Sequence, residues 1–500
     1  MRVLATVWGL TIFLTALAGC NPEIFPGLFK AGTNNPSGGG AVFGAGGAFS
    51  ENLIQARTFV DGVAADTITY AVSDMTRTPL GADFNLDGKI DPIVGYGKEQ
   101  GVIQILLSVG PVGSADFVSL TLDSKRDMTL LSDVAIGDID GDGFLDVVAG
   151  AEGAVWYFHH PSSGVTTDLP AWGNTDPEDD LRERIESSST LLGNDELQAI
   201  ITNALGPGVN LADYIVTIEQ KFTNVEVADM DNDGEMDIAA SRAFEINLEP
   251  RPEVPVEPIQ IIDGDVMVFL NPGRAETGRD WIAISAGRHE RQIRLDRDGA
   301  AGLMVFDMDQ DGDLDLLSAA SDDNNAQIAW FENPGGPLDP NTPWTQWRIG
   351  SVRDAWGIDI ADVTGDGRPD VVATGSEQQQ MLLFEQPATG AKRTFDWDTF
   401  VLATFESFDP RDLKVLDIDL DGALEIVVGA TGGAVRIFES GVNPRSTWTA
   451  GKITDFDPPG DVGWLGYGDL DGDGDLDLVA VVDADQPNDE QISWIRNELR

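Results

Sequence analysis

One nine-residue motif occurs seven times in this chain and constrains its fold more than any other feature. The clearest copy runs from Asp469 to Asp477 and precedes an apolar run, residues 478–482. Acidic residues stand at its positions 1, 3, 5 and 9, and Gly474 stands at position 6. Glycine reaches positive φ at little cost, so the backbone can turn there and bring the carboxylates toward one point. The carbonyl of position 7 is a further expected ligand, by analogy with an EF-hand loop. Because these ligands are all oxygens and mostly anionic, the motif predicts a Ca²⁺-binding loop.

Six further copies precede this one, and they begin at Asp83, Asp138, Asp229, Asp307, Asp362 and Asp417. The 500 residues include 85 acidic residues and 56 glycines. A random chain of that composition would hold acid-acid-Gly-acid at positions 1, 5, 6 and 9 only about 0.3 times. The start-to-start intervals are 55, 91, 78, 55, 55 and 52 residues, which indicates a unit of about 55 residues with two insertions. A repeat of this length is typical of propeller blades.

Numbered 1 to 7 along the chain, the loops supply a defined set of expected metal ligands at positions 1, 3, 5 and 9. These are Asp83, Asn85, Asp87 and Asp91; Asp138, Asp140, Asp142 and Asp146; Asp229, Asp231, Asp233 and Asp237; Asp307, Asp309, Asp311 and Asp315; Asp362, Thr364, Asp366 and Asp370; Asp417, Asp419, Asp421 and Glu425; and Asp469, Asp471, Asp473 and Asp477. Loops 2, 3, 4 and 7 carry four carboxylates each and are expected to bind most tightly. Asn85, Thr364 and Glu425 predict weaker or altered binding in loops 1, 5 and 6. Up to seven Ca²⁺ ions are predicted, and an empty structural turn is the alternative for each loop.

The segments around each loop have the pattern of β-strands. In the fifth unit, apolar runs at residues 356–361, 369–374, 381–384 and 397–402 are separated by Gly, Pro and Asp. Short β-branched and aromatic runs bounded in this way are typical of strands. A dockerin or EF-hand would need a helix after each loop, and the sequence there favours a strand instead. The chain is therefore predicted to be all-β, a seven-bladed β-propeller with Ca²⁺ loops between the first and second strands of its blades.

Tryptophans recur at fixed places in the units, in third strands and near the start of fourth strands. They include Trp156, Trp330 and Trp494 in third strands, and Trp281, Trp344 or Trp347, Trp397 and Trp448 near the start of fourth strands. Such recurrence favours packing between adjacent sheets over the alternative of sugar-stacking platforms, because a propeller buries each blade face against its neighbour.

The last unit lacks a fourth strand, and the chain before loop 1 holds strand-like runs at residues 54–60 and 67–72. An N-terminal strand that completes the last blade would close the ring and remove two exposed sheet edges. We expect the propeller to span residues 51–500.

Strand directions place the connections on two faces. The loops between first and second strands lie on one face, and so do the connections between third and fourth strands. The insertion at about residues 161–210, with a helix-like stretch at 176–192, is expected on this calcium face. The proline-rich insertion at about residues 242–262 is expected on the opposite face, together with the segment around Arg288, His289 and Arg291.

The N-terminus has the pattern of an export signal. Residues 3–16 are apolar after a basic start, and they are too few for a comfortable membrane span. Residues 17–20 resemble a bacterial lipobox, which implies a signal peptide at 1–19 and a lipid on Cys20, the single cysteine. An ordinary signal peptide is the alternative. Glycine-rich residues 20–50 are expected to be a flexible tether. Asn21 favours the outer membrane by resemblance to enteric lipoproteins, with either face of that membrane possible.

The formal net charge of −54 argues against a nucleic-acid partner, which requires clustered cations. Twenty-six carboxylates stand at positions 1, 3, 5 and 9 of the loops. Seven Ca²⁺ ions would still leave the protein at about −40, so its surface is expected to be self-repelling and solvated.

The pattern D-x-[D/N]-x-D-G-x-x-D, repeated before apolar strands over about residues 50–500, resembles FG-GAP/VCBS repeats. This family includes the integrin α-subunit head and many bacterial surface proteins. The resemblance implies a seven-bladed propeller with Ca²⁺ in first-to-second strand loops. The Phe-Gly and Gly-Ala-Pro signatures are not visible in most units, so the bacterial branch fits better than the integrin branch.

Three functions are consistent with these features. The first is a lipid-anchored binding or adhesion module for a glycan or protein, and the second is a lyase or hydrolase acting on acidic polysaccharide. The third is a structural scaffold of the envelope. Arg288, His289 and Arg291 form the candidate binding cluster, with ordinary salt bridges as the alternative. His159 and His160 are strand neighbours that point to opposite faces, so they are not expected to share a metal. No catalytic residue is assigned, and an enzyme is not favoured.

Overall fold

The computed structural model describes most of the seven repeats and little of the first 80 residues. The described residues are 49–54, 71–72, 83–96, 102–112, 116–122, 131–160, 182–185, 197–198, 200–202, 210–252, 257–273, 281–289, 300–320, 326–392, 396–456, 460–483 and 491–497. Cys20, the expected signal peptide 1–19 and Arg291 lie outside them. Among the described residues, no helix has the length and apolar character needed to span a bilayer.

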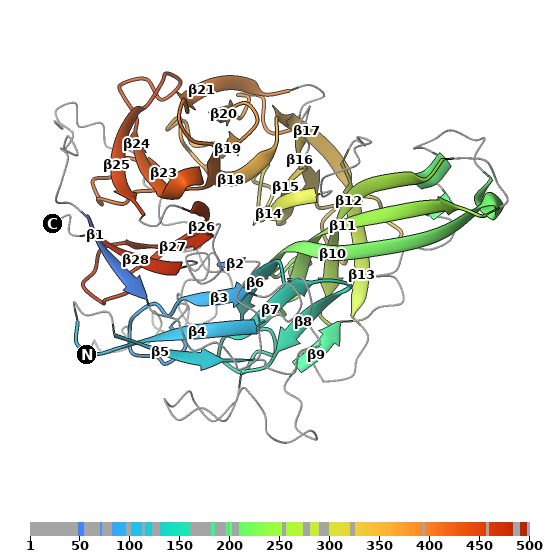
Figure 1. The fold of residues 1–500 in the computed structure, drawn as a ribbon, viewed down its shortest axis with the longest axis horizontal. Helices are drawn as coiled ribbons and strands as arrows, with labels where there is room; N and C mark the ends of the chain where they lie inside the picture. The colour runs from blue at the N-terminus through green and yellow to red at the C-terminus, as the bar shows by residue number, and fades with distance from the viewer. Residues whose placement is uncertain are drawn as a thin grey trace, which may run out of the picture.

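The strands form seven antiparallel four-stranded sheets arranged as the blades of a ring (Figure 1), as the repeats predict. Blade 1 contains β2 (Ala71–Val72), β3 (Ile93–Tyr96), β4 (Val102–Val109) and β5 (Asp116–Thr121), and blade 2 contains β6 (Asp133–Gly137), β7 (Asp146–Ala151), β8 (Ala154–Phe158) and β9 (Arg182–Ile185). Blade 3 contains β10 (Tyr214–Ala228), β11 (Asp237–Pro250), β12 (Ile259–Leu270) and β13 (Ile282–Arg288), and blade 4 contains β14 (Ala300–Phe306), β15 (Asp315–Ala320), β16 (Ala326–Glu332) and β17 (Thr345–Val352). Blade 5 contains β18 (Ala355–Ala361), β19 (Asp370–Gly375), β20 (Gln380–Glu385) and β21 (Asp398–Thr404), and blade 6 contains β22 (Pro410–Leu416), β23 (Glu425–Ala430), β24 (Ala434–Glu439) and β25 (Thr449–Asp455). Two short 3₁₀ helices, η1 (Leu211–Asp213) and η2 (Thr431–Gly433), lie between strands.

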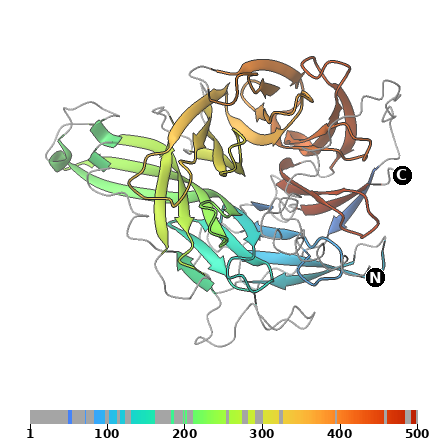
Figure 2. The same cartoon turned by 180° about the vertical axis from the view of Figure 1, so that it is seen from behind.

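Blade 7 is completed by the N-terminal part of the chain. It contains β26 (Asp461–Gly468), β27 (Asp477–Asp483) and β28 (Gln491–Asn497), and β1 (Phe49–Ile54) pairs with β28 as the fourth strand. Figure 2 shows this closing pair from behind. The predicted closure is confirmed, but the strand lies at 49–54 rather than 54–60 and begins inside the expected tether. β2 falls in the run 67–72 and opens blade 1 instead.

The strand positions follow the apolar runs closely. The four expected runs of blade 5 coincide with β18 to β21 within two residues at either end. Each described residue of the second strands β7, β19 and β23 is buried. Both faces of such a strand are covered because each blade packs between two neighbours. The exposed pattern of the fourth strand β25 reflects its place at the rim.

The hydrophobic core is divided into layers between neighbouring blades. One cluster joins blades 4 and 5 and contains Trp330 and Trp397, and another joins blades 3 and 4 and contains Trp344. Trp330 is fully buried, with no exposed surface, and the other recurring tryptophans of the third and fourth strands are buried or packed against these layers. The packing role predicted for them is confirmed. The blades are therefore held together by aromatic layers that no single blade could bury alone.

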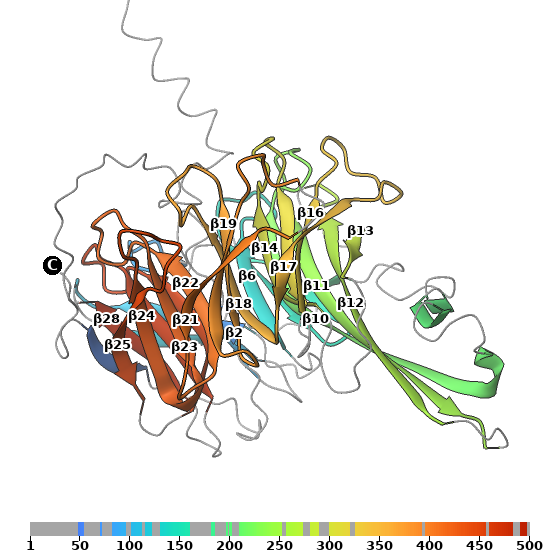
Figure 3. The ribbon, with the colours of Figure 1, turned by 90° about the horizontal axis from the view of Figure 1, so that it is seen from above.

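The insertion at 242–262 extends blade 3 into a β-arm, residues 214–222, 242–250 and 259–265. Figures 1 and 3 show this arm leaving the disc at one side. β10 and β11 stay paired along it, from Tyr214 opposite Pro250 to Phe222 opposite Arg242. Because β10 runs toward loop 3, the arm lies on the face opposite the loops, as predicted. The buried ion pair between Arg242 and Asp265 lies at its base, with Nη2 and Oδ2 2.5 Å apart.

The insertion at 161–210 differs from its prediction. Residues 182–185 form the fourth strand β9 inside the expected helix 176–192. Because this strand leads away from the loops, Ile200 and Ile201, which are described residues after it, belong to the opposite face rather than the calcium face. Ile200 and Ile201 pack against Phe244 and Leu248 of the β-arm. The error arose because the sequence offered no signal that a four-residue strand divides the insertion.

Candidate metal centres

All seven motif loops connect the first and second strands of their blades, as predicted. Each loop is closed by the same two hydrogen bonds. The position 6 glycine donates its N–H to the position 1 aspartate, for example from Gly312 to Asp307 at 3.0 Å. The residue at position 7 donates to the position 5 aspartate, for example from Asp313 to Asp311 at 3.1 Å. The position 6 glycines have φ between 86° and 98°, so the reason given for glycine at this position is confirmed.

Position 4 requires the same left-handed backbone, and the sequence reasoning missed it. Three loops meet the requirement with glycine, at Gly141, Gly365 and Gly472. The other four hold Leu86, Asn232, Gln310 and Leu420 at φ of 57–60°. Side chains adopt this region at a cost of order 1–3 kcal/mol unless the surroundings enforce it. The three glycines were the available signal. Strained backbone at the same position of four loops fits a conformation set by a ligand.

Five of the loops bring three carboxylates together. Oxygens within 4.8 Å of one another come from Asp138, Asp140 and Asp146; Asp229, Asp231 and Asp237; Asp307, Asp309 and Asp311; Asp417, Asp419 and Glu425; and Asp469, Asp471 and Asp473. Buried oxygens without a hydrogen-bond donor include Oδ1 of Asp138, Asp231 and Asp417. A buried carboxylate oxygen without a donor is costly unless a cation satisfies it. The donor set is all oxygen, so these residues fit a hard divalent cation such as Ca²⁺.

The raised pKa values of the loop carboxylates also fit a site for a cation. Burial, together with the neighbouring charges of Asp142 and Asp140, raises the pKa of Asp138 above its ordinary value. Burial is also the main reason that the pKa of the position 9 acid rises to about 7 in Asp146, Asp237, Asp370 and Asp477, and to about 8 in Asp91, Asp315 and Glu425. A bound cation would favour the ionised forms of these carboxylates.

The position 9 carboxylate also has a structural role that the sequence did not predict. In Asp315, Oδ2 accepts the N–H of Met308 at 2.9 Å, and Oδ1 accepts the N–H of Asn333 at 2.8 Å. This pattern ties the loop to the end of the third strand. It recurs in blades 1, 2, 3 and 7, and in blade 5 with Thr364 as the first donor. Each carboxylate oxygen has more than one lone pair, so metal ligation by position 9 stays a prediction.

Side chains at or after the ends of third strands connect five of the loops to a neighbouring blade. Asn333 Nδ2 donates to the carbonyl of Met230 in loop 3 at 2.8 Å and to that of Leu314 in its own loop at 2.9 Å. Asn271 and Asn497 repeat both bonds, Gln386 repeats the bond to the neighbour, and Ser108 Oγ joins blade 1 to Leu470 of blade 7 at 2.9 Å. The loops are therefore part of the contacts between blades. Asparagine after the strand ending at Glu332 was a visible signal, but its partner lies about 100 residues away.

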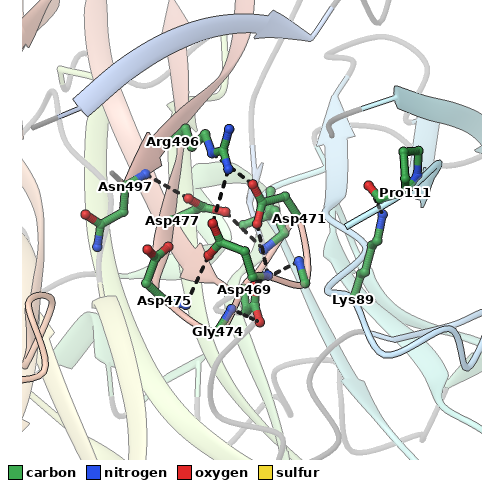
Figure 4. A network of polar contacts seen from close by, with 12 residues as sticks. Lys89, Pro111, Asp469, Asp471, Gly474, Asp475, Asp477, Arg496 and Asn497 are labelled. Carbon is green, nitrogen blue, oxygen red and sulfur yellow. Dashed lines mark hydrogen bonds and ion pairs between the residues drawn. The ribbon is translucent and has the colours of Figure 1, made fainter. Parts of the chain in front are cut away.

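Protein cations contact two of the loops that carry four carboxylates. Lys392 Nζ lies 2.6 Å from Asp309 Oδ2 in loop 4. In loop 7, Arg496 contacts Asp471 at 2.9 Å (Figure 4), and it also contacts Asp473 at 3.1 Å. These side chains already neutralise part of the acidic cluster and would compete with a metal ion there. In loop 3, by contrast, the described residues give Asp231 no ion pair.

The two adjacent histidines lie beside loop 2 and have separate surroundings. His159 Nδ1 lies 3.5 Å from Asp140 Oδ2, and burial lowers the pKa of this imidazole. His160 instead stacks on Phe144 with ring centroids 4.7 Å apart. Both histidines lie just after the end of β8, and their rings have different contact partners.

Two of the three residues of the candidate cluster on the opposite face, Arg288 and His289, lie in the described residues. Arg288 lies over the ring of Phe244, 5.4 Å from its centroid. His289 is buried, its Nε2 lies 3.0 Å from Ser318 Oγ, and burial lowers its pKa to about 4. Its position at the end of β13 agrees with the predicted face, but its imidazole is not presented to solvent.

Comparisons with known proteins match part of the repeats to a family. The FG-GAP-like repeat family matches residues 307–373 and 417–480. The first range runs from loop 4 into β19 and includes loop 5, and the second runs from loop 6 into β27 and includes loop 7. A search of curated proteins finds no match to this chain.

Several solved structures are similar at low identity. YCF48 from Cyanidioschyzon merolae is 10% identical, with 90% of this chain and 99% of that chain covered and a TM-score of 0.45. The BP39L lectin from Burkholderia pseudomallei is 12% identical, with 87% and 97% covered and a TM-score of 0.42. The Dos1 propeller is 7% identical, with 82% and 75% covered and a TM-score of 0.40.

Proposed function

We propose that this protein is a Ca²⁺-stabilised binding module of the bacterial cell envelope, which presents the loops of its opposite face to a glycan or protein. The observation that supports it best is the coupling of acidic loops to blade contacts. Asn333 joins the carbonyls of two neighbouring loops, so an ion that fixes one loop also fixes the adjacent blade. A rigid ring that carries connecting loops on the face opposite the metal loops is suited to binding a ligand there, as in propellers that serve as binding modules.

Each loop would hold the ion with its own residues. In the five clusters, the carboxylates at positions 1 and 3 supply anionic oxygens together with the acid at position 5 in loops 4 and 7 or at position 9 in loops 2, 3 and 6, and the glycine at position 6 allows the turn that brings them together. The position 9 carboxylate orients the loop through backbone N–H groups. The ion contributes charge neutralisation, since it offsets the repulsion among clustered carboxylates. Loop 3 is expected to bind well, because Asp231 has no competing cation among the described residues.

Calcium removal tests the first half of this proposal. At about 1 mM Ca²⁺ and site affinities of about 10⁻⁴–10⁻³ M, each occupied site should add roughly 0.4–1.4 kcal/mol to the free energy of unfolding. Five sites should then raise the melting temperature by about 2–7 °C over the value in chelator. Asp231→Asn should remove part of that gain, whereas Asp339→Asn, an exposed control, should not. An equal melting temperature with and without Ca²⁺ would refute calcium stabilisation.

Ligand capture tests the second half. The Ca²⁺-loaded protein is passed over immobilised neutral and acidic polysaccharides and a panel of purified matrix proteins, with and without chelator. Retention that depends on Ca²⁺, without release of unsaturated uronide, supports a binding module. Release of uronide supports the lyase alternative, and no retention on any surface contradicts the binding function. A nucleic-acid partner is not proposed, because the chain carries a net charge of −54.

We further propose that the protein is exported and anchored by a lipid on Cys20, with the outer membrane favoured. This proposal is supported by the apolar run 3–16, the lipobox-like residues 17–20 and Asn21. Metabolic labelling with a fatty acid in a bacterial host should label the wild type but not Cys20→Ser. Equal labelling of both, or none in the wild type, would contradict lipidation.

A further inference from the structure

A pocket of about 410 Å³ lies on the face opposite the metal loops, where blades 5 and 6 meet. It is lined by Asp354, Trp356, Ser376, Glu377, Gln379, Asp409 and Arg411. These residues come from turns and strand starts that all point away from the loops. The volume lies in the range of about 300–1,000 Å³ that is usual for small-ligand sites. None of these residues belongs to a metal loop.

The backbone of this pocket is strained in the same way as the metal loops. Six non-glycine residues have positive φ in the described part of the chain. Four of them occupy position 4 of metal loops, and the other two, Asp354 at 54° and Gln379 at 51°, line this pocket. Such conformations persist where surrounding contacts enforce them, and they concentrate at ligand sites. In the described structure, non-glycine residues with positive φ therefore occur at the metal loops and at this pocket.

Hydrogen bonds hold the pocket walls in place. Ser376 donates its N–H to the carbonyl of Asp354 at 3.0 Å and its hydroxyl to the Asp354 carboxylate. Gln379 Nε2 donates to Asp409 Oδ1 at 2.8 Å, which joins blade 5 to the connection before β22. The walls are therefore positioned without a ligand, and such preorganisation favours binding.

An indole and a guanidinium in the lining of the site lie against each other. The side chain of Trp356 is 39% exposed, unlike the buried tryptophans between the blades. Arg411 Cζ lies 4.3 Å from the centroid of its ring, and Arg411 Nη2 lies 3.0 Å from Asp461 Oδ2. Trp464 of blade 7 meets the same indole edge to face, with centroids 6.4 Å apart. Three blades thus fix the orientation of one exposed aromatic ring.

The chemistry of the lining restricts the ligand. Asp354, Glu377 and Asp409 make the pocket acidic, so it would repel carboxylates, phosphates and uronic acids. Arg411 already lies on the indole, so a cationic ligand would be repelled at the place where it would otherwise gain a cation–π contact. Hydroxyl groups can donate to the carboxylates and accept from the guanidinium. A ligand with hydroxyls around an apolar ring face matches both the lining and the exposed indole.

We propose that this pocket binds a neutral saccharide, with one sugar ring on Trp356 and its hydroxyls on Asp409 and Arg411. The proposal rests on the binding function proposed above and specifies its site and ligand class.

The test uses saturation-transfer NMR and tryptophan fluorescence on the Ca²⁺-loaded full chain. The probes are glucose, galactose, mannose, N-acetylglucosamine, maltose and cellobiose, with glucuronate and choline as charged comparators. At least one neutral saccharide should bind, with a dissociation constant on the order of 1 mM. Trp356→Ala and Asp409→Asn should each weaken that binding at least about tenfold. Trp356→Phe should retain part of it, and Asp339→Asn, the same charge change near the metal loops, should leave it unchanged.

The melting temperature of each variant in Ca²⁺ shows whether it is folded. No saccharide binding by the folded wild type, or equal binding by folded Trp356→Ala, would overturn the proposal. So would choline or glucuronate binding that the pocket variants abolish. If polysaccharides or proteins are still captured in those cases, the binding function stands and only this site fails. If nothing is captured at all, both fail.

Discussion

Replacing Asn333 with alanine should destabilise the ring by about 3 kcal/mol. The side chain is 3% exposed. Its amide donates to Met230 and Leu314 at 2.8 and 2.9 Å, and its Oδ1 accepts the N–H of Gly335 at 3.0 Å. Three hydrogen bonds at roughly 1 kcal/mol each give this figure, and the buried carbonyls left without a donor would add to it.

The expected loss can be measured as a melting temperature. With an unfolding entropy of about 2.1 cal/mol/K per residue, a disc of about 450 residues loses roughly 3 °C for 3 kcal/mol. The assay is differential scanning calorimetry in saturating Ca²⁺, combined with guanidinium unfolding followed by fluorescence and circular dichroism. Asn341→Ala is the matched control, because Asn341 is exposed and its amide bonds only Asp339. Its effect should stay within about 0.5 kcal/mol.

Asn333→Asp separates hydrogen bonding from packing. Aspartate has the same size, but it replaces the amide donor with a charged acceptor directed at two carbonyl oxygens. It should therefore destabilise more than alanine does. If Asn333→Ala costs no more than Asn341→Ala, or Asn333→Asp is as stable as the wild type, the inter-blade amide does not hold the ring and the reasoning is wrong.

Three further changes test other parts of the structure. His289 is neutral in the fold because burial lowers its pKa to about 4, so its contribution is complete above pH 6.5 and is lost as the pH falls toward 4. The wild type should lose about 2.5 kcal/mol more than His289→Gln between pH 7.5 and 4.5 in denaturant unfolding, and parallel pH profiles would contradict this. Gly312→Ala places a side chain at φ 98° and should cost at least about 1 kcal/mol and weaken Ca²⁺ binding by calorimetry, whereas Gly463→Ala in open space should do neither. Arg242→Met leaves Asp265 buried and unpaired and should cost about 3–5 kcal/mol of unfolding free energy. Adding Asp265→Leu should recover most of that cost, and a double variant as unstable as the single one would show that the loss is not electrostatic.

The sequence alone determined the local and repeated parts of this protein. The motif at Asp469 and its six copies specify a turn through their own residues, and the apolar runs beside them specify strands. Both signals act over fewer than about ten residues, so they can be interpreted without a fold. The number of copies then set the number of blades, and the ends of the chain predicted how the ring closes.

Only the tertiary structure revealed the contacts between residues that lie far apart in the chain. Ser108 bonds a carbonyl 362 positions away, and Asn333 bonds one 103 positions away. In six blades, the role of the position 9 carboxylate as an anchor depends on a third strand that the motif does not contain. Trp356 contacts both Arg411 and Trp464 only because three blades converge there. Such contacts leave no periodic pattern in the sequence. The two residues of each contact are brought together by the closure of the ring, and the residues next to them in the chain do not indicate the pairing.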